Sequence, residues 1–228
     1  MARLRPYLAP LTLGVLGTLV LVSLGIWQMQ RLAWKEAVLD EIAAQIGAPP
    51  VALPANPEEE RHQFLPVFLE GVIGERELAV LVSRRDTGAG FRIIARYDTE
   101  DGRAILLDRG FVTSARKPEA RPGGEARIVG NLHWPDEIDG YTPQPDRGAG
   151  IWFARDIPAM AAELGTEPVL VVQSEPVAMP GAPRPFPVDT AHIRNDHLQY
   201  AGTWFLLALS WAGMTLYWLL RIRRAGRG

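Results

Sequence analysis

Two uncharged apolar runs dominate what this chain can fold into. They occupy residues 8–27 and 201–220, and each is twenty residues long without a charged side chain. At 1.5 Å of rise per residue, a helix of that length crosses the ~30 Å hydrocarbon core of a bilayer. A helix also satisfies its own backbone hydrogen bonds, which lipid cannot do. The sequence therefore predicts two transmembrane helices.

The first run has an alternative interpretation as a cleaved signal peptide, because a short basic start precedes it. Two features favour a retained helix. The run is longer than the roughly 7–15 apolar residues of a signal peptide, and no small-x-small cleavage site follows it. Instead, Trp27 stands at its end, in the position where amphipathic aromatic residues settle at a membrane interface.

Basic residues flank both runs on the sides that lead to the chain ends. Two arginines precede the first run, four follow the second, and neither tail has an acidic residue. By the positive-inside rule, both termini are expected in the cytoplasm and the middle of the chain outside. That middle holds 18 basic and 26 acidic groups, a formal charge of −8. A domain this acidic is a poor candidate for nucleic-acid binding, so no nucleic-acid partner is expected.

The residues between the two runs are predicted to form a β-rich domain. Apolar stretches bounded by turn residues predict strands at 64–73, 77–83, 91–98, 103–112, 125–134 and 168–174. A short helix over 156–164 is expected to end at Gly165, which can serve as its C-cap. A mostly antiparallel sheet around one core is the simplest architecture for these elements.

The expected fold class is a membrane α+β protein, with two transmembrane helices that bracket an external, mostly antiparallel β-rich domain with a short helix. The segments are a cytoplasmic N-tail (1–7), a transmembrane helix (8–28), a helical extension and proline-rich connector (29–60), a periplasmic β-rich domain (61–175), a proline-rich strap (176–196), a second transmembrane helix (197–220) and a basic cytoplasmic C-tail (221–228).

The chain carries none of the common catalytic motifs. It has no G-x-S-x-G elbow, H-E-x-x-H zinc site, P-loop or G-x-G-x-x-G fingerprint. The acidic runs 58–60 and 136–137 lie in polar sequence and are interpreted as solvated loops. The chain is therefore not expected to be an enzyme, although a hydrolase with an unrecognised site is the alternative.

Metal chemistry is restricted by composition. The chain has no cysteine, which excludes thiol chemistry, and its five methionines are scattered, which disfavours copper(I). The histidines are His62, His133, His192 and His197, and only long-range folding could assemble a zinc site from them. No copper or zinc site is expected, and His62 and His133 are interpreted as surface or strand-end residues.

The second apolar run carries an aromatic stripe with a histidine at its outer end. His197, Trp204, Trp211 and Trp218 are spaced by seven, which keeps them close to one helix face. One interpretation is that the tryptophans are lipid anchors and His197 is a polar cap. The other is a flat apolar surface for a large planar ligand such as haem, whose iron accepts a histidine nitrogen as axial ligand.

Three sequence blocks, in order, resemble the surfeit-locus (Surf-type) family of cytochrome c oxidase assembly factors. The blocks are Leu24-Gly25-Ile26-Trp27-Gln28 followed by Arg31 and Lys35; Gly90-Phe91-Arg92 with Leu107-Asp108-Arg109-Gly110-Phe111; and Asn195-Asp196-His197-Leu198-Gln199-Tyr200-Ala201 with Thr203-Trp204-Phe205. The chain departs from the family pattern at Phe111 and Thr113, where Trp and Pro are usual. No mitochondrial presequence precedes the first helix, so the bacterial branch and a bacterial inner (plasma) membrane are expected.

The resemblance implies an assembly factor that binds haem A transiently and helps insert it into oxidase subunit I. It implies that His197 is the axial ligand of the haem iron, that Tyr200 and Trp204 line the haem, and that Gly25 and Trp27 face them from the first helix. The expected partners are cytochrome c oxidase subunit I, the haem A synthase and membrane lipid.

Two non-enzymatic alternatives stay open at this point. The chain could instead be a membrane scaffold that stabilises a folding intermediate of subunit I without carrying haem. An external sensor is disfavoured, because the predicted cytoplasmic tails of 7 and 8 residues are too short for an output module.

Overall fold

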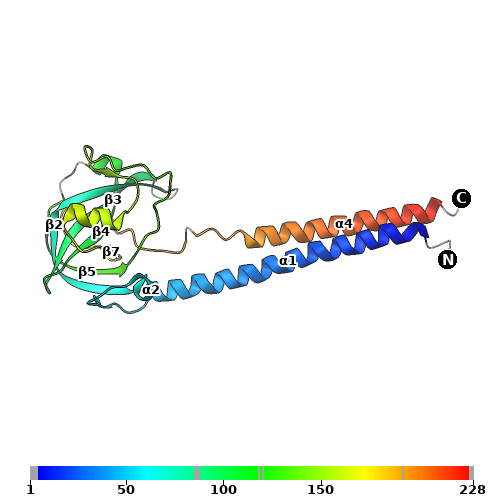
Figure 1. Cartoon of the computed structure of the whole chain (residues 1–228), viewed down its shortest axis with the longest axis horizontal. Helices are drawn as coiled ribbons and strands as arrows, with labels where there is room; N and C mark the ends of the chain where they lie inside the picture. Colours follow the sequence, from blue (N-terminus) through cyan, green and yellow to red (C-terminus); the bar gives the residue numbers. More distant parts are fainter. Residues whose placement is uncertain (1–4, 85–87, 118, 120, 192, 226–228) are drawn as a thin grey trace. The chain divides into compact units, whose positions relative to one another are not determined.

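The computed structural model describes residues 5–84, 88–117, 119, 121–191 and 193–225. The chain divides into two compact units. One comprises Met1–Glu41 with Ala191–Gly228, and the other comprises Ile42–Thr190. The first unit contains the two long helices, and the second contains the sheet. The predicted fold class is confirmed, because two apolar helices bracket a mixed β-sheet domain with a short helix (Figure 1).

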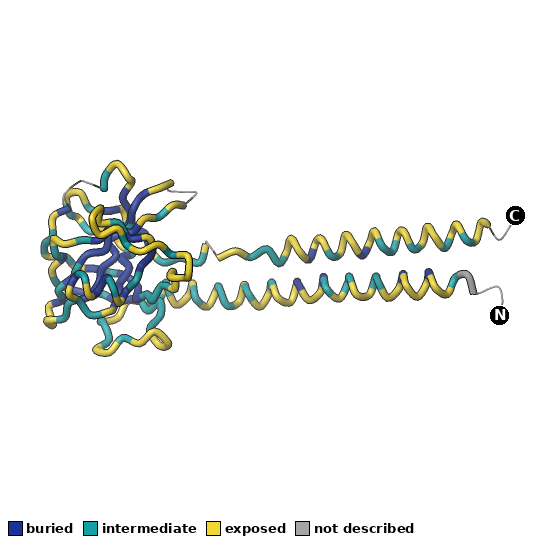
Figure 2. The backbone as a smooth tube through the Cα atoms, turned by 45° about the horizontal axis from the view of Figure 1, so that its top comes forward, coloured by how far each residue is buried: buried dark blue, intermediate teal, exposed yellow. Residues whose placement is uncertain are grey.

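Helix α1 spans Arg5–Ile46 and helix α4 spans His197–Ala225. Both are long and apolar enough to cross a membrane. A core helix of a soluble protein would pass the same test, but it would be mostly buried. Only 17% of the apolar window of α1 and 6% of that of α4 is buried, and Figure 2 shows both helices largely exposed along their length. An exposed apolar surface of this size is consistent with a membrane protein.

The helix pair is antiparallel and closely packed (Figure 1). Gly14, Gly17 and Gly25 of α1 lie against side chains of α4, and a Cβ atom on any of them would collide with those side chains. On α4, Ala201 and Ala208 are buried in the same seam. Small residues at such positions allow two membrane helices to approach closely, where dispersion contacts replace the absent hydrophobic effect.

The sheet contains seven strands. They are β1 (Val51–Ala52), β2 (Pro66–Arg84), β3 (Gly88–Thr99), β4 (Ala104–Thr113), β5 (Gly124–Leu132), β6 (Ile151–Trp152) and β7 (Leu170–Gln173). Its order is β1-β2-β3-β4-β7-β5, and β5 pairs again with β2. The sheet therefore closes on itself as a barrel of β2, β3, β4, β7 and β5. The β1–β2, β2–β6 and β4–β7 pairs are parallel, and the other pairs are antiparallel.

Strand β2 corrects the prediction of two separate strands at 64–73 and 77–83. The structure has one strand with a register shift between Ile73 and Glu77. The first part of β2 pairs with β5, and the longer second part pairs with β3. The bulge turns the strand at the corner of the barrel, and glycine is needed nearby because a Cβ on Gly71 would collide with the carbonyl oxygen of Asp98.

The barrel has an inner and an outer apolar layer. Side chains from all five barrel strands meet in one core cluster, which includes Leu69, Tyr97, Leu107, Ile128 and Val171. Alternate residues of β2, β3, β4 and β7 face outward, where helix α3 (Ile157–Leu164) covers them. The period-2 alternation of strands thus supplies both layers. In Figure 2 the barrel strands are the main buried part of the molecule.

The short helix was predicted correctly. The side chain of Asp156 caps its N-terminus by accepting a hydrogen bond from the Ala159 amide at 3.1 Å. Gly165 ends the helix in the left-handed conformation, with φ 67° and ψ 49°. A side chain with a Cβ is disfavoured in that conformation, which is why glycine occupies this C-cap.

Some short elements differ from the prediction. The segment 58–60 was predicted as a solvated loop, but Glu59 and Glu60 begin helix α2 (Glu59–His62). Acidic residues in the first turn are favourable there, because they complement the helix dipole. The proline-rich connector also contributes β1, which adds to β2. Residues 114–116 form a 3₁₀ turn, η1 (Ser114–Arg116), that the sequence did not predict.

Candidate functional site

The three sequence blocks fall in two places in the structure. The first and third blocks lie in the helix pair, at the end where α4 begins. The second block lies in the barrel, on β3 and β4.

The entrance to α4 is held by local polar contacts. The guanidinium of Arg194 pairs with the carboxylate of Asp196 at 2.7 Å. The carbonyl of Asp196 accepts the first helical hydrogen bond, from the Tyr200 amide at 3.1 Å. These contacts start the helix at His197, so the imidazole is on its first residue.

His197 contacts α1 directly through its ring. Its Nδ1 lies 2.8 Å from Oε1 of Gln28, a side chain that is only 9% exposed. This contact is a hydrogen bond in the tautomer that carries its proton on Nδ1 and donates it to the Gln28 oxygen. In that tautomer Nε2 keeps its lone pair, which is the form of histidine that binds a metal.

A hydrogen bond of this kind is characteristic of histidines that ligate metals. Such a histidine usually donates its second ring N–H to a carboxylate, carbonyl or other acceptor, which fixes both the tautomer and the ring orientation. Gln28 can do both for His197. Gln28 belongs to the first sequence block but was not predicted as a site residue. Its sequence signal is a polar residue three positions after Gly25, on the helix face that meets α4.

The glycine expected in the site has a packing role in the structure. The three atoms nearest to a Cβ built on Gly25 all belong to the Phe205 ring, the closest at 2.5 Å. Gly25 therefore faces the residue after Trp204, rather than Tyr200 or Trp204 themselves. It lets α1 and α4 approach closely one turn below the His197–Gln28 bond.

The aromatic stripe of α4 is partly covered by α1. Trp211 packs on Gly17, and its indole nitrogen lies 3.4 Å from the carbonyl oxygen of Leu13. At this depth the stripe belongs to the seam between the helices and is not an open surface. Trp218, farther along, is 50% exposed, as expected of a lipid-facing anchor.

The outer part of the stripe remains accessible. Tyr200 is exposed and Trp204 is half-buried. Both lie on the same edge of α4 as Trp211, which contacts Leu13. Leu13 and Trp27 are fourteen residues apart, close to four helical turns, so Trp27 lies on that same flank of α1. The exposed aromatic residues Trp27 and Tyr200 thus flank the His197–Gln28 bond on one side of the pair.

This arrangement fits a haem better than a bare metal ion. Within the described ranges, no group of three or more His, Asp or Glu side chains could hold an ion. His192 lies outside the described residues. One histidine is sufficient for a haem, because the porphyrin supplies the four equatorial ligands. The donor set, with an oriented imidazole beside exposed aromatic faces, is compatible with that group.

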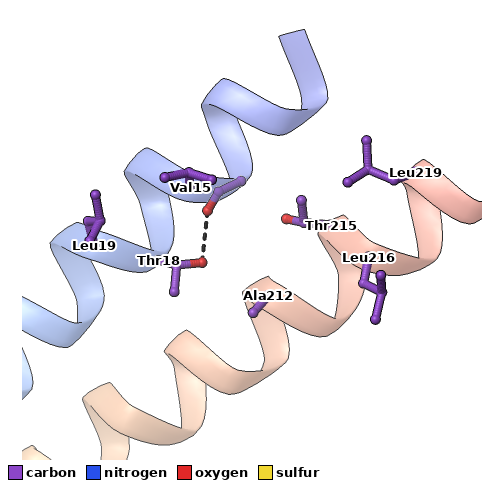
Figure 3. Close-up of a pocket in the computed structure, with 8 residues that line it drawn as sticks. Val15, Thr18, Leu19, Ala212, Thr215, Leu216 and Leu219 are labelled. Carbon is purple, nitrogen blue, oxygen red and sulfur yellow. Dashed lines mark hydrogen bonds between the residues drawn. The ribbon is translucent and has the colours of Figure 1, made fainter. Parts of the chain in front are cut away.

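A separate apolar groove of about 310 Å³ lies deeper in the pair (Figure 3). Val15 and Leu19 line it from α1, and Leu216 and Leu219 line it from α4. The hydroxyl of Thr18 donates to the Gly14 carbonyl at 2.8 Å, so its polar atom is already satisfied. The groove starts nine residues from Gln28, roughly 14 Å along α1, and does not belong to the His197 site.

The second sequence block forms a buried charge network in the barrel. Asp108 on β4 has a fully buried side chain, and it accepts a hydrogen bond from Arg92 on β3 at 2.6 Å. Its other oxygen accepts from the Gly110 amide at 3.0 Å. Burial lowers the pKa of Arg92, although the neighbouring carboxylate of Asp108 opposes the shift. The network holds an ion pair inside the sheet domain.

The network continues into the loop after β5. Arg155 lies 3.6 Å from Asp108 and also binds Glu137, which was predicted as part of a solvated loop. Glu137 lies in an exposed loop, as predicted, but its carboxylate also accepts the Arg155 amide at 3.0 Å and the Arg155 guanidinium, contacts that the sequence did not predict. Burial alone would raise the pKa of Glu137, but the hydrogen bonds and charge of Arg155 outweigh it and hold the pKa below its usual value.

Arg92 and Phe111 attach the proline-rich strap to the barrel. The guanidinium of Arg92 donates to the Phe186 carbonyl at 2.8 Å and lies 4.5 Å from the ring centroid. The backbone of Phe111 exchanges two hydrogen bonds with Arg184. The departure from the family pattern at Phe111 is accommodated by a tilted ring contact with Phe186, with centroids 5.9 Å apart.

The other predicted histidines have structural positions. His62 is the last residue of α2, and its Nδ1 accepts the amide proton of Glu58 at 2.9 Å. His133 directly follows β5 and stacks on Phe64, with ring centroids 5.6 Å apart. The interpretation as a strand-end residue is confirmed for His133, whereas His62 is half-buried at the end of a helix.

The comparisons with known proteins match most of this chain to members of one family. The model of the SURF1 family matches residues 15–209. Surfeit locus protein 1 of Xenopus tropicalis is 30% identical over 226 aligned residues, covering 89% of this chain and 72% of that protein. Surfeit locus protein 1 of Rattus norvegicus is 28% identical, with 90% and 73% covered. The SURF1-like protein of Drosophila melanogaster is 30% identical, with 88% and 73% covered.

Proposed function

Because the chain belongs to the SURF1 family, we propose that it is a membrane chaperone for a haem-copper oxidase. In this proposal it binds haem A through His197 and helps to insert it into oxidase subunit I. The protein has no catalytic role; it binds, orients and releases the cofactor.

The observation that carries this proposal is the 2.8 Å contact between His197 Nδ1 and Gln28 Oε1. Gln28 orients the imidazole and leaves the Nε2 lone pair for iron. An imidazole without that partner could rotate or take the other tautomer, in which Nε2 is protonated and cannot ligate.

Release is as important as binding for a carrier. His197 would hold the haem through one ring nitrogen, and the bound iron would supply a Lewis acid there. His197 supplies that single ligand from the first turn of α4, beside the exposed rings of Tyr200 and Trp27. A site held by one protein ligand and apolar contacts at the edge of a helix pair can pass its cofactor on without unfolding.

The proposal is tested by comparing His197→Ala with wild type, both purified from cells that make haem A. We expect the variant to lose most of its haem and to lose the low-energy shifts of the visible spectrum that an imidazole ligand causes. Ser210→Ala, an exposed position on the same helix, is the matched control and should retain wild-type spectrum and stoichiometry. An unchanged haem content and spectrum in His197→Ala would sink the ligand assignment.

The same variant separates the proposal from a scaffold role. A scaffold without haem predicts that cells with His197→Ala still assemble an oxidase with its full haem content. The carrier role predicts a shortage of haem in subunit I, measured in membranes by optical spectroscopy at matched levels of the chaperone.

The orientation in the membrane is part of the proposal. Because the helices are antiparallel, the N-terminal end of α1 and the C-terminal end of α4 lie at the same end of the pair (Figure 1). The arginines at that end of the pair favour the cytoplasm. The barrel would then lie in the periplasm of a bacterial inner membrane, with His197 near the outer leaflet. The haem A synthase is proposed as the donor of the cofactor and subunit I as its acceptor.

A further inference from the structure

Arg31 stands next to the His197 site and has no role in the proposal so far. It is three residues after Gln28 and four after Trp27, so it lies one helical turn farther along the same face of α1. Its Cα is about 4.5 Å beyond that of Gln28 along the helix axis, toward the polar end of the pair. Arg31 is exposed.

The guanidinium of Arg31 is positioned by stacking. Its central carbon lies 4.4 Å from the centroid of the Trp34 ring. Stacking uses the flat face of the guanidinium and leaves its in-plane N–H donors available. No carboxylate of the described residues forms an ion pair with it.

The neighbouring cations at this end of the pair are already engaged. The ammonium of Lys35 donates to the Arg194 carbonyl, and the side chain of Arg194 pairs with Asp196. Arg31 differs from both, because it lies over the Trp34 ring and forms no ion pair with a carboxylate of the described residues. A fixed fork of donors suits a carboxylate better than a solvated ammonium would.

We propose that Arg31 binds a propionate carboxylate of the haem held by His197. The inference rests on the proposed function. A porphyrin is apolar over its faces and carries two carboxylates on one edge. Carboxylates are costly in hydrocarbon, so that edge must point from His197 toward the polar end of the pair. Arg31 is on that path, on the flank where Trp27 and Tyr200 expose their rings.

The role of Arg31 is tested by changing both partners: the arginine is substituted in the protein, and the propionate carboxylates are masked in the ligand. The full chain in detergent is titrated with haem A and with its dimethyl ester, which keeps the ring and iron but has no anionic group. Arg31→Gln should weaken the binding of haem A by about tenfold, the size expected for one charge-assisted interaction, and leave the ester unaffected. The affinity of Arg31→Lys for haem A should lie between those of the wild type and Arg31→Gln, because lysine keeps the charge but loses the forked pair of donors.

A matched control removes an arginine at the other end of the pair. Arg223→Gln, in the last turn of α4, should bind both ligands as the wild type does. Equal losses for haem A and its ester in Arg31→Gln would overturn the inference and assign Arg31 a structural role. If Arg31→Gln binds both ligands with unchanged affinity, the inference is also overturned, and the arginine would be assigned to lipid headgroups instead.

The outcomes also separate this inference from the proposed function. Arg31→Gln protein that keeps the His197-dependent spectrum with unchanged affinity refutes the role of Arg31 alone. The proposed function, and this inference with it, is refuted if the wild-type protein binds neither ligand, or if His197→Ala binds both ligands as well as the wild type does.

Discussion

At the scale of single residues, the site depends on a contact between two side chains that are 169 positions apart. The imidazole of His197 and the amide of Gln28 meet because α1 and α4 run antiparallel with a fixed offset. Neither residue alone defines a ligand. The pair defines which ring nitrogen faces away from α1, and that atom determines what the site can bind.

A substitution at Gln28 tests this dependence without touching the ligand. Gln28→Leu removes the acceptor for Nδ1, so the imidazole loses both its preferred tautomer and its orientation. We expect haem affinity to fall by about 10–100-fold, the usual effect of removing a partner of a metal-bound histidine. The measurement is an optical haem titration of the purified protein.

Gln28→Glu is the matched variant, because it keeps an oxygen acceptor at the same place. It should bind haem at least as well as wild type does. If Gln28→Leu and Gln28→Glu both titrate like wild type, then the contact does not orient His197.

His197 itself could be predicted from the sequence as a candidate ligand, but its partner could not. Spacing along α4 identifies which of its residues share a face. It does not determine which residues of α1 lie opposite them, because that depends on the offset of the two helices. The same limitation applies to Trp211: the spacing of seven predicted the stripe, and only the position of Gly17 shows that α1 covers it there.

At the scale of elements, β3 and β4 carry two ion pairs of opposite character. The Arg92–Asp108 pair is buried, with side chains 11% and 0% exposed. The Arg96–Asp98 pair is on the surface, with side chains 38% and 46% exposed. Water screens the surface pair, so it contributes little, whereas the buried charges depend on each other.

Because one pair is buried and the other is exposed, the same Asp→Asn substitution is expected to lower the free energy of unfolding by different amounts in the two pairs. Asp108→Asn leaves the buried guanidinium groups of Arg92 and Arg155 without their shared carboxylate. We expect it to lower the free energy of unfolding of the barrel by about 3–5 kcal/mol, with the strap at Phe186 loosened. Thermal or denaturant unfolding of the full chain, followed by a probe in the barrel, measures it.

Asp98→Asn is the control on the neighbouring strand and should shift the midpoint far less. Equal shifts for the two variants would show that the buried network does not support the barrel. The strands that hold these pairs were largely predicted from the sequence. The fusion of 64–73 and 77–83 into β2 was not, since a bulge that continues a strand and a turn that ends it have similar local sequences.

At the scale of the whole molecule, the proposed orientation rests on two helices that run in opposite directions. If both helices span the membrane, both chain ends are expected on one side and the barrel on the other. The absence of cysteine from the chain makes this directly measurable, because one introduced cysteine is the only thiol in the protein.

Tyr141→Cys places that thiol in the barrel at a side chain that is 94% exposed. In spheroplasts of a bacterial host, a membrane-impermeant maleimide should label it without lysis. Arg224→Cys, in the last turn of α4, should be labelled only after lysis. The reverse pattern would place the barrel in the cytoplasm and contradict the proposed orientation.

The closed barrel limits how another protein can engage this domain. Strand β2 pairs with β5 along its first part and with β3 along the rest, while β1 and β6 add two residues each beside it. Recognition by strand addition needs a longer row of unpaired amides and carbonyls than β1 and β6 offer. The barrel has another open row on β5, because β7 pairs only with its last three residues, 130–132. A client subunit would therefore have to recognise that row or side chains on loops, on α3 or on the strap. Docking on side chains would depend on sequence, and the short β1 and β6 would resist the edge-to-edge aggregation that threatens open sheets.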